Sequence, residues 1–134
     1  MITRKEARNQ AFMLVFEKSI NGNDTEDILE AAKECRDFSE DDDGYTVQAF
    51  TGTFENIDEI DSIISDNLST GWTISRISKV ALAVLRLAIF EIKYMDEIPE
   101  AVSIDEAVEL CKTYTTADDA SFVNGVLGTV VRKK

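Results

Sequence analysis

A chain of 134 residues, 44% hydrophobic and with one proline, is long enough to bury a core and favours one mostly helical domain over residues 1–134. A net charge of −12 argues against a broadly basic nucleic-acid-binding surface, and the absence of histidine excludes histidine-dependent catalysis. No export signal opens the chain, and the longest apolar run, residues 80–92, is too short to span a bilayer. We therefore expect a cytoplasmic protein.

The first predicted helix begins at a capping box formed by Thr3 and Glu6 and runs to about Lys18. Its expected buried stripe holds Ala7, Ala11, Leu14 and Val15. Residues 21–23 break this helix, and Asp24 caps a second one that extends to Cys35.

An acidic run at residues 40–44 predicts a solvated turn. It fails as a calcium-binding loop because Phe50 falls where the bidentate glutamate is required. A third helix is predicted over residues 47–64, where apolar residues recur at spacings of three and four. Residues 80–92 are apolar nearly all round, which is typical of a helix surrounded by other helices.

Two further helices follow Pro99. Ser103 and Glu106 form a second predicted capping box, and Thr116 with Asp119 caps the last helix. The valines near the C-terminus make a strand conceivable, but the chain offers no partner strand. The sequence therefore predicts an all-α bundle.

The charge is unevenly distributed along the chain. Residues 21–67 hold 15 acidic and two basic residues, whereas the segments on either side are near neutral. Basic residues cluster at the N-terminus and at residues 76–79. A local basic patch can attract phosphate where an acidic flank would repel it. The acidic block serves solubility or, alternatively, docks a basic protein partner.

Signatures of catalysis or metal binding are absent from the sequence. No phosphate-binding loop, dinucleotide-binding glycine pattern or zinc spacing occurs. Carboxylates are most densely grouped in the acidic run, where a solvated surface is the simpler interpretation. Cys35 and Cys111, both in predicted helices, are expected to be buried, reduced thiols. These features predict a binding protein and not an enzyme.

Four segments, in order, resemble the NusB family of bacterial transcription antitermination factors. The strongest covers residues 98–127, where IPEAVSIDEAVEL is followed by a polar turn and FVNGVL. SRISKV at 75–80 and VLRLAIFE at 84–91 are similar to the family's central-helix signature. RKEARNQA at 4–11 resembles a shortened form of its arginine-rich start.

This resemblance implies a bundle of about six to seven helices in two packed subdomains, without a cofactor or metal. It also implies binding of the single-stranded boxA element of nascent ribosomal RNA, as a heterodimer with the ribosomal protein NusE, in the transcription elongation complex. The alternative is a helical protein–protein interaction module that has lost RNA binding. A fusion to an RNA methyltransferase, as some NusB-like domains show, is not expected because no catalytic domain follows before Lys134.

Five basic residues match family positions that imply contact with RNA. Arg4, Lys5 and Arg8 match the basic N-terminal helix, where cations bind phosphates and guanidinium groups also stack on bases. Arg76 and Lys79 are expected as further phosphate contacts.

Two residues near the last helix complete the implied RNA site. Asp118 can accept hydrogen bonds from base amino or imino groups, or it is simply an acidic charge at a helix N-terminus. Phe122 can stack on an unpaired base, or it belongs to the core. Arg86 is interpreted as a structural ion-pair partner, and Asn124 and Gly125 as residues that permit close helix approach and a buried polar bond.

Some positions depart from the family pattern. Met13 stands where glutamine is common, which removes a group that could read a base. Ala81 and Leu82 replace a charged pair in the central helix. This second change predicts an exposed apolar patch, which would favour a homodimer.

Overall fold

The computed structural model describes residues 2–35, 38–39 and 44–133. Within these residues the chain forms seven α-helices, one short 3-10 helix and no strand, which confirms the all-α expectation. The elements are α1 (Arg4–Asn21), α2 (Thr25–Lys33), α3 (Tyr45–Glu55), α4 (Ile57–Asp66), η1 (Ile74–Arg76), α5 (Lys79–Tyr94), α6 (Glu100–Tyr114) and α7 (Ala117–Lys133). Of the turn predicted at residues 40–44, residues 40–43 lie outside the described part of the chain.

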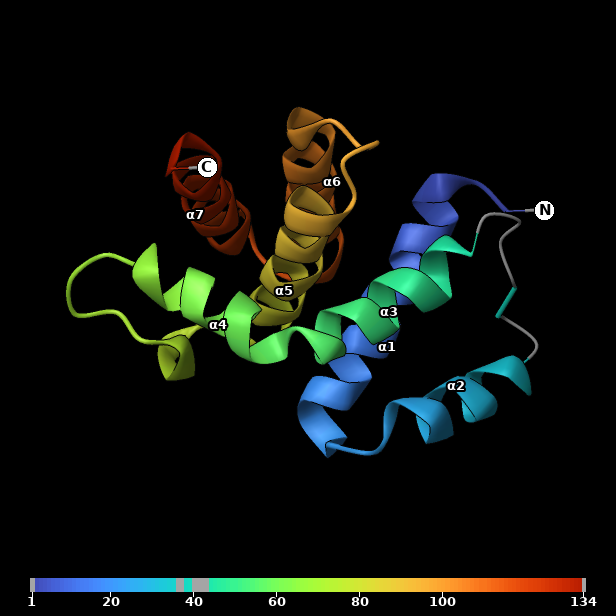
Figure 1. Ribbon diagram of the computed structural model, residues 1–134. Coiled ribbons are helices and arrows are strands. Elements are labelled where there is room, and N and C mark those ends of the chain that lie inside the picture. The colour runs from blue at the N-terminus through green and yellow to red at the C-terminus, as the bar shows by residue number, and fades with distance from the viewer. Residues whose placement is uncertain (1, 36–37, 40–43, 134) are drawn as a thin grey trace.

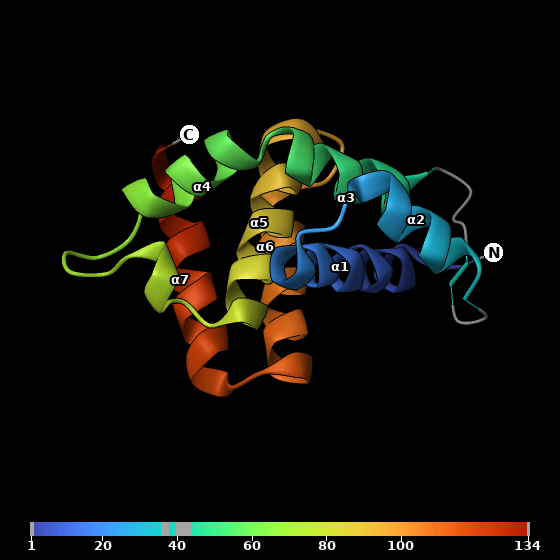
Figure 2. The ribbon, with the colours of Figure 1, turned by 90° about the horizontal axis from the view of Figure 1, so that it is seen from below.

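Helix α5 is the centre of the fold (Figure 1). It packs against α1, α3, α4, α6 and α7, and 11 of its 16 residues are buried, as its apolar sequence predicts. Figure 2 shows α1, α2 and α3 gathered on one side of α5, with α4 and α7 on the other. Helix α6 packs on both α5 and α7. None of the described helices is long and apolar enough to cross a membrane.

The N-terminus of α1 is fixed by its capping box. The Thr3 hydroxyl accepts a hydrogen bond from the Glu6 backbone N–H (3.1 Å), and the Glu6 carboxylate accepts one from the Thr3 backbone N–H (3.1 Å). The Thr3 hydroxyl also donates to this carboxylate (3.0 Å), and the two bonds that the carboxylate accepts from Thr3 lower the pKa of Glu6. The helix continues to Asn21, three residues past the predicted end, because Gly22 (φ 70°) supplies the left-handed cap.

The prediction of a single third helix over residues 47–64 is wrong, because the helix is interrupted at Asn56 and divided into α3 and α4. The Asn56 side chain donates a hydrogen bond to the Gly52 carbonyl oxygen (2.8 Å). Asparagine side chains compete in this way with the helical backbone. The apolar spacing continues across the break, so periodicity alone could not reveal it.

The capping box predicted at Ser103 is also wrong. Helix α6 begins at Glu100, directly after Pro99, whose fixed φ (−59°) suits the first turn of a helix. Ser103 therefore lies inside the helix, is 2% exposed, and donates a hydrogen bond to the Glu91 carboxylate (2.9 Å). The cap predicted at Thr116 is confirmed, since its hydroxyl accepts a bond from the Asp119 N–H (3.0 Å).

The close approach expected at Gly125 is found at another glycine. Asn124 and Gly125 are exposed, and a Cβ at Gly125 would meet nothing within 4 Å. A Cβ at Gly52 would instead overlap the Phe90 ring, so this glycine lets α3 approach α5.

Two further expectations about burial are overturned. Ala81 and Leu82 are buried in α5 (0% and 6% exposed), so the predicted apolar patch is absent and the reason for expecting a homodimer falls away. Cys111 is buried as predicted, but Cys35 is exposed because it follows the last turn of α2. The ion pair expected of Arg86 is confirmed by two hydrogen bonds to Asp61 (2.8 and 2.9 Å).

Candidate nucleic-acid interface

The first turns of α1 place the three N-terminal cations in different environments. Lys5 is exposed, and its ammonium lies 3.6 Å from the Glu106 carboxylate of α6. Arg4 is half-buried, with its guanidinium 4.6 Å from the centre of the Tyr45 ring. Arg8 is only 5% exposed. Lys5 is therefore exposed and Arg4 partly exposed, whereas Arg8 points into the protein.

Arg8 belongs to a buried network centred on Glu91 of α5. Its guanidinium donates two hydrogen bonds to the Glu91 carboxylate (2.7 and 3.2 Å). The same carboxylate, which is 1% exposed, also accepts hydrogen bonds from the hydroxyls of Tyr45 (α3) and Ser103 (α6). One buried carboxylate thus joins helices α1, α3, α5 and α6.

The network raises the pKa values of Arg8 and Tyr45. Burial alone would lower the pKa of Arg8, but its hydrogen bonds and attraction to Glu91 outweigh that effect, and the pKa is raised. Burial and the adjacent Glu91 charge raise the pKa of Tyr45 strongly, so its hydroxyl remains a donor. The expectation that Arg8 contacts RNA phosphates does not fit this placement, because its charge is neutralised inside the protein.

A second group of predicted residues converges at the N-terminus of α7. Arg76, Asp118 and Phe122 all line one hollow of about 220 Å³. The Trp72 ring, which is 44% exposed, lies 5.6 Å from the Phe122 ring in the same hollow. The Arg76 guanidinium lies 5.1 Å from the Trp72 ring centre and donates to the Gly71 carbonyl (3.1 Å). Two rings and one guanidinium therefore surround this hollow.

The hollow is held in shape by Asp119, next to Asp118. The Asp119 carboxylate accepts hydrogen bonds from the Ser78 hydroxyl (2.8 Å) and the Thr115 hydroxyl (2.6 Å). Ser78 is itself the N-cap of α5, where its oxygen accepts from the Ala81 N–H (3.1 Å). The N-termini of α5 and α7 are thereby tied together, and Lys79 at the start of α5 is exposed beside the tie.

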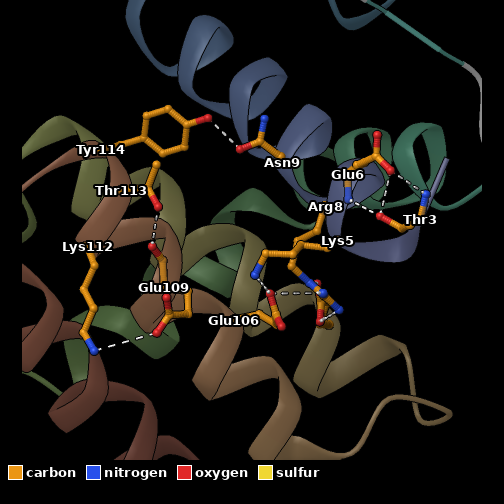
Figure 3. Close-up of polar contacts among 11 residues, drawn as sticks. Thr3, Lys5, Glu6, Arg8, Asn9, Glu106, Glu109, Lys112, Thr113 and Tyr114 are labelled. Carbon is orange, nitrogen blue, oxygen red and sulfur yellow. Dashed lines mark hydrogen bonds and ion pairs between the residues drawn. The ribbon is translucent and has the colours of Figure 1, made fainter.

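The structure brings together Arg76, Asp118 and Phe122, but it keeps Arg4 and Lys5 apart from them on α1. Tyr114, at the end of α6, contacts α1 two residues before the turn to α7 is complete. Its hydroxyl donates to the Asn9 side chain of α1 (2.6 Å), as Figure 3 shows, and its ring lies 5.0 Å from that of Phe12. Two turn residues then lead to α7.

Trp72 and Tyr114 were missed by the sequence reasoning. The available signal for Trp72 was that it is the chain's single tryptophan and lies four residues before Arg76. No local pattern shows that Trp72 would lie against Phe122, because the two residues are far apart in the sequence and meet only when α5 packs against α7.

Comparisons with known proteins agree with this architecture. The sequence profile described as the NusB family matches residues 5–132. The chain is 43% identical over 131 residues to the transcription antitermination protein NusB of Acetivibrio thermocellus, covering 98% of this chain and 90% of that protein. It is 42% identical over 130 residues to the protein of the same name from Clostridium acetobutylicum, covering 97% and 96%.

Solved structures with the same arrangement include T. maritima NusB. Its TM-score is 0.85 at 33% identity, covering 99% of this chain and 94% of that one. A second is a crystal structure of antitermination factors NusB and NusE in complex with dsRNA. Its matching chain has a TM-score of 0.87 at 26% identity, covering 98% of this chain and 97% of that one.

Proposed function

The chain belongs to the NusB family, and from that premise we propose that it is a transcription antitermination factor. It binds single-stranded boxA-type RNA as one RNA-binding domain, together with the ribosomal protein NusE, in the transcription elongation complex. The names of the relatives support a role in antitermination, and the solved complex of NusB and NusE with dsRNA supports NusE and RNA as partners.

The hollow between Trp72 and Phe122 is the observation that carries the proposal. Aromatic rings stack on unpaired bases, and an adjacent guanidinium adds a planar cation that stacks or binds phosphate. Arg76 supplies that cation. The exposed carboxylate of Asp118 can accept hydrogen bonds from the amino or imino edge of a base in the hollow. This combination suits a single strand, whose bases are free to leave the stack.

Phosphate contacts in the proposal come from the cations at the surface. Lys79 lies beside the hollow at the N-terminus of α5, where the helix dipole adds partial positive charge. Arg4 and Lys5 extend the path along α1, past Tyr114. Arg8 acts by fixing the first turns of α1 through Glu91. With few cations, phosphate attraction is modest, and the bases must contribute much of the affinity.

The acidic character of the chain supports a basic protein partner. Glu55, Asp58 and Glu59 are exposed around the start of α4, and Glu26 and Asp27 are exposed on the first turn of α2. Complementary charge steers association and suppresses wrong partners. We propose that such acidic surface faces the ribosomal protein NusE, whereas the α5 and α7 N-termini face RNA.

An RNA titration tests the function. Fluorescence anisotropy with a labelled boxA RNA is measured at low salt, with and without NusE. Binding that tightens with the partner is expected. The variant Arg4→Ala/Lys5→Ala should bind more weakly, whereas Lys93→Ala, which removes an exposed cation near the other end of α5, should not. If RNA stays unbound even with NusE present, the alternative of a protein–protein interaction module is favoured.

A further inference from the structure

Glu106 places a negative charge directly at the proposed phosphate-binding turn. One of its carboxylate oxygens lies 3.6 Å from the Lys5 ammonium and 3.8 Å from an outer nitrogen of Arg8. Figure 3 shows Lys5 and Arg8 of α1 directed toward Glu106 of α6. The Glu106 side chain is 26% exposed and that of Lys5 is 72% exposed. This pair is therefore accessible to an approaching polyanion.

The buried part of the cluster does not need Glu106 for charge balance. The Arg8 guanidinium already has a close carboxylate partner in Glu91, at 2.7 Å. The longer Glu106 contact consequently adds a second negative charge on the solvent side of Arg8. Lys5 and Arg8 supply two positive charges, and two carboxylates supply two negative ones. This cluster therefore carries little net positive charge.

We propose that Glu106 is an internal competitor for RNA phosphate, which sets the affinity of the α1 turn. This inference rests on the proposed function. In the free protein Glu106 pairs with Lys5, so a phosphate that binds Lys5 must displace the carboxylate or lie beside a like charge. Exposed pairs of this kind are individually weak, so RNA can displace the carboxylate but gains less from Lys5. Glu106 thereby weakens binding of any polyanion and makes the contacts in the Trp72–Phe122 hollow more important.

The variant Glu106→Gln tests this role while keeping the side chain's size. The control Glu109→Gln removes the same charge one helical turn away, at a residue that forms an ion pair with Lys112 (3.7 Å). Both variants change the long-range field equally, so a difference between them reports the local contact. Chemical denaturation first establishes that both remain folded.

We expect Glu106→Gln to bind boxA RNA and a homopolymer of the same length about two- to fivefold more tightly, as for loss of an exposed ion pair. Its affinity should also depend more steeply on salt, by up to about 0.7 in the log–log slope, because one more phosphate is neutralised. Glu109→Gln should show less than half of that gain. An unchanged salt slope, or an equal gain in both variants, would overturn the inference.

A double-mutant cycle with Lys5→Ala isolates the contact. The gain from Glu106→Gln should disappear when Lys5 is absent, because the competitor then has no exposed cation to occupy. A gain that persists in the Lys5→Ala background overturns the inference alone. Failure of the wild-type chain to bind RNA, with or without NusE, overturns the proposed function, and the inference falls with it.

Discussion

Arg8 Nε and Glu91 Oε2 lie 2.7 Å apart in the interior of the protein, although 83 residues separate them in the sequence. Both side chains are nearly inaccessible to solvent. Removing one partner of a buried pair leaves an unpaired charge in a medium that solvates it poorly. This pair fixes the position of the helix that carries the N-terminal cations.

We expect Glu91→Ala to lower the free energy of unfolding by about 3–5 kcal/mol, because Arg8 stays buried without a partner. Two further donors, Tyr45 and Ser103, lose their acceptor at the same time. The matched control is Asp61→Ala, which removes the partner of the less buried Arg86 and should cost about 1 kcal/mol or less. Urea denaturation measures both variants. Equal losses would contradict a special role for the Glu91 network.

Lys5→Ala should weaken RNA binding and reduce the log–log salt slope by less than about 0.7, the value for one full phosphate contact on a single strand, because Glu106 competes for the Lys5 ammonium. Because Lys5 is exposed, its replacement should change the free energy of unfolding little. Any loss of RNA affinity then reports the binding contact itself. Anisotropy titrations between low and physiological salt measure the slope. A slope identical to that of the wild type would exclude Lys5 as a phosphate contact.

The single tryptophan provides a direct probe of the hollow. A base that stacks near Trp72 should quench its emission, and Phe122→Ala should weaken RNA binding by about 1–3 kcal/mol through loss of one stacking surface. Phe122→Tyr keeps the ring and should bind nearly as the wild type does. Unchanged Trp72 emission at saturating RNA would place the bases elsewhere.

The two thiols should differ in reactivity. Cys35 is exposed and should react promptly with a thiol reagent at pH 8. Burial raises the pKa of Cys111 to about 12, so little thiolate forms there and its reaction requires unfolding. We expect the reagent to modify one thiol per chain in the native state and two after denaturation. A second fast equivalent in the folded protein would contradict the burial of Cys111.

The raised pKa of Cys111 also predicts that the stability of the protein falls at alkaline pH. The pKa of Cys111 is higher folded than unfolded, where it is near 9.0. Its protonated form therefore contributes stability fully below pH 9, and this contribution is lost as the pH rises toward about 12. The stability difference between the wild type and Cys111→Ala should shrink between pH 8 and pH 11. A difference that stays constant would contradict the shift.

Alanine substitutions at two glycines should change the stability of the protein in opposite directions. Gly52→Ala forces a methyl group into the Phe90 ring between α3 and α5 and should destabilise the protein by about 1–3 kcal/mol. Gly125→Ala meets open space on α7 and should stabilise it by up to about 1 kcal/mol through helix propensity. Thermal unfolding of both variants distinguishes them. Destabilisation by Gly125→Ala would show that this glycine has a packing role after all.

Much of the fold was predictable because the responsible signals are local. The Thr3 capping box, the cap at Thr116 and the central helix at residues 80–92 depend on residues within a few positions of one another. The errors arose where one pattern allows two structures. Ser103 with Glu106 matches a capping box but lies inside a helix, and the apolar spacing runs unbroken through Asn56.

By itself the sequence determined the helices, their caps and the resemblance to a family, because periodicity and short motifs encode these features within one or two turns. Only the tertiary structure decided which charged residues reach solvent. Arg4, Lys5 and Arg8 look alike in the sequence, yet Arg8 is buried against Glu91 while Lys5 faces Glu106. The function of a charged side chain depends on its dielectric surroundings and on partners from distant helices, and these exist only once the helices have packed.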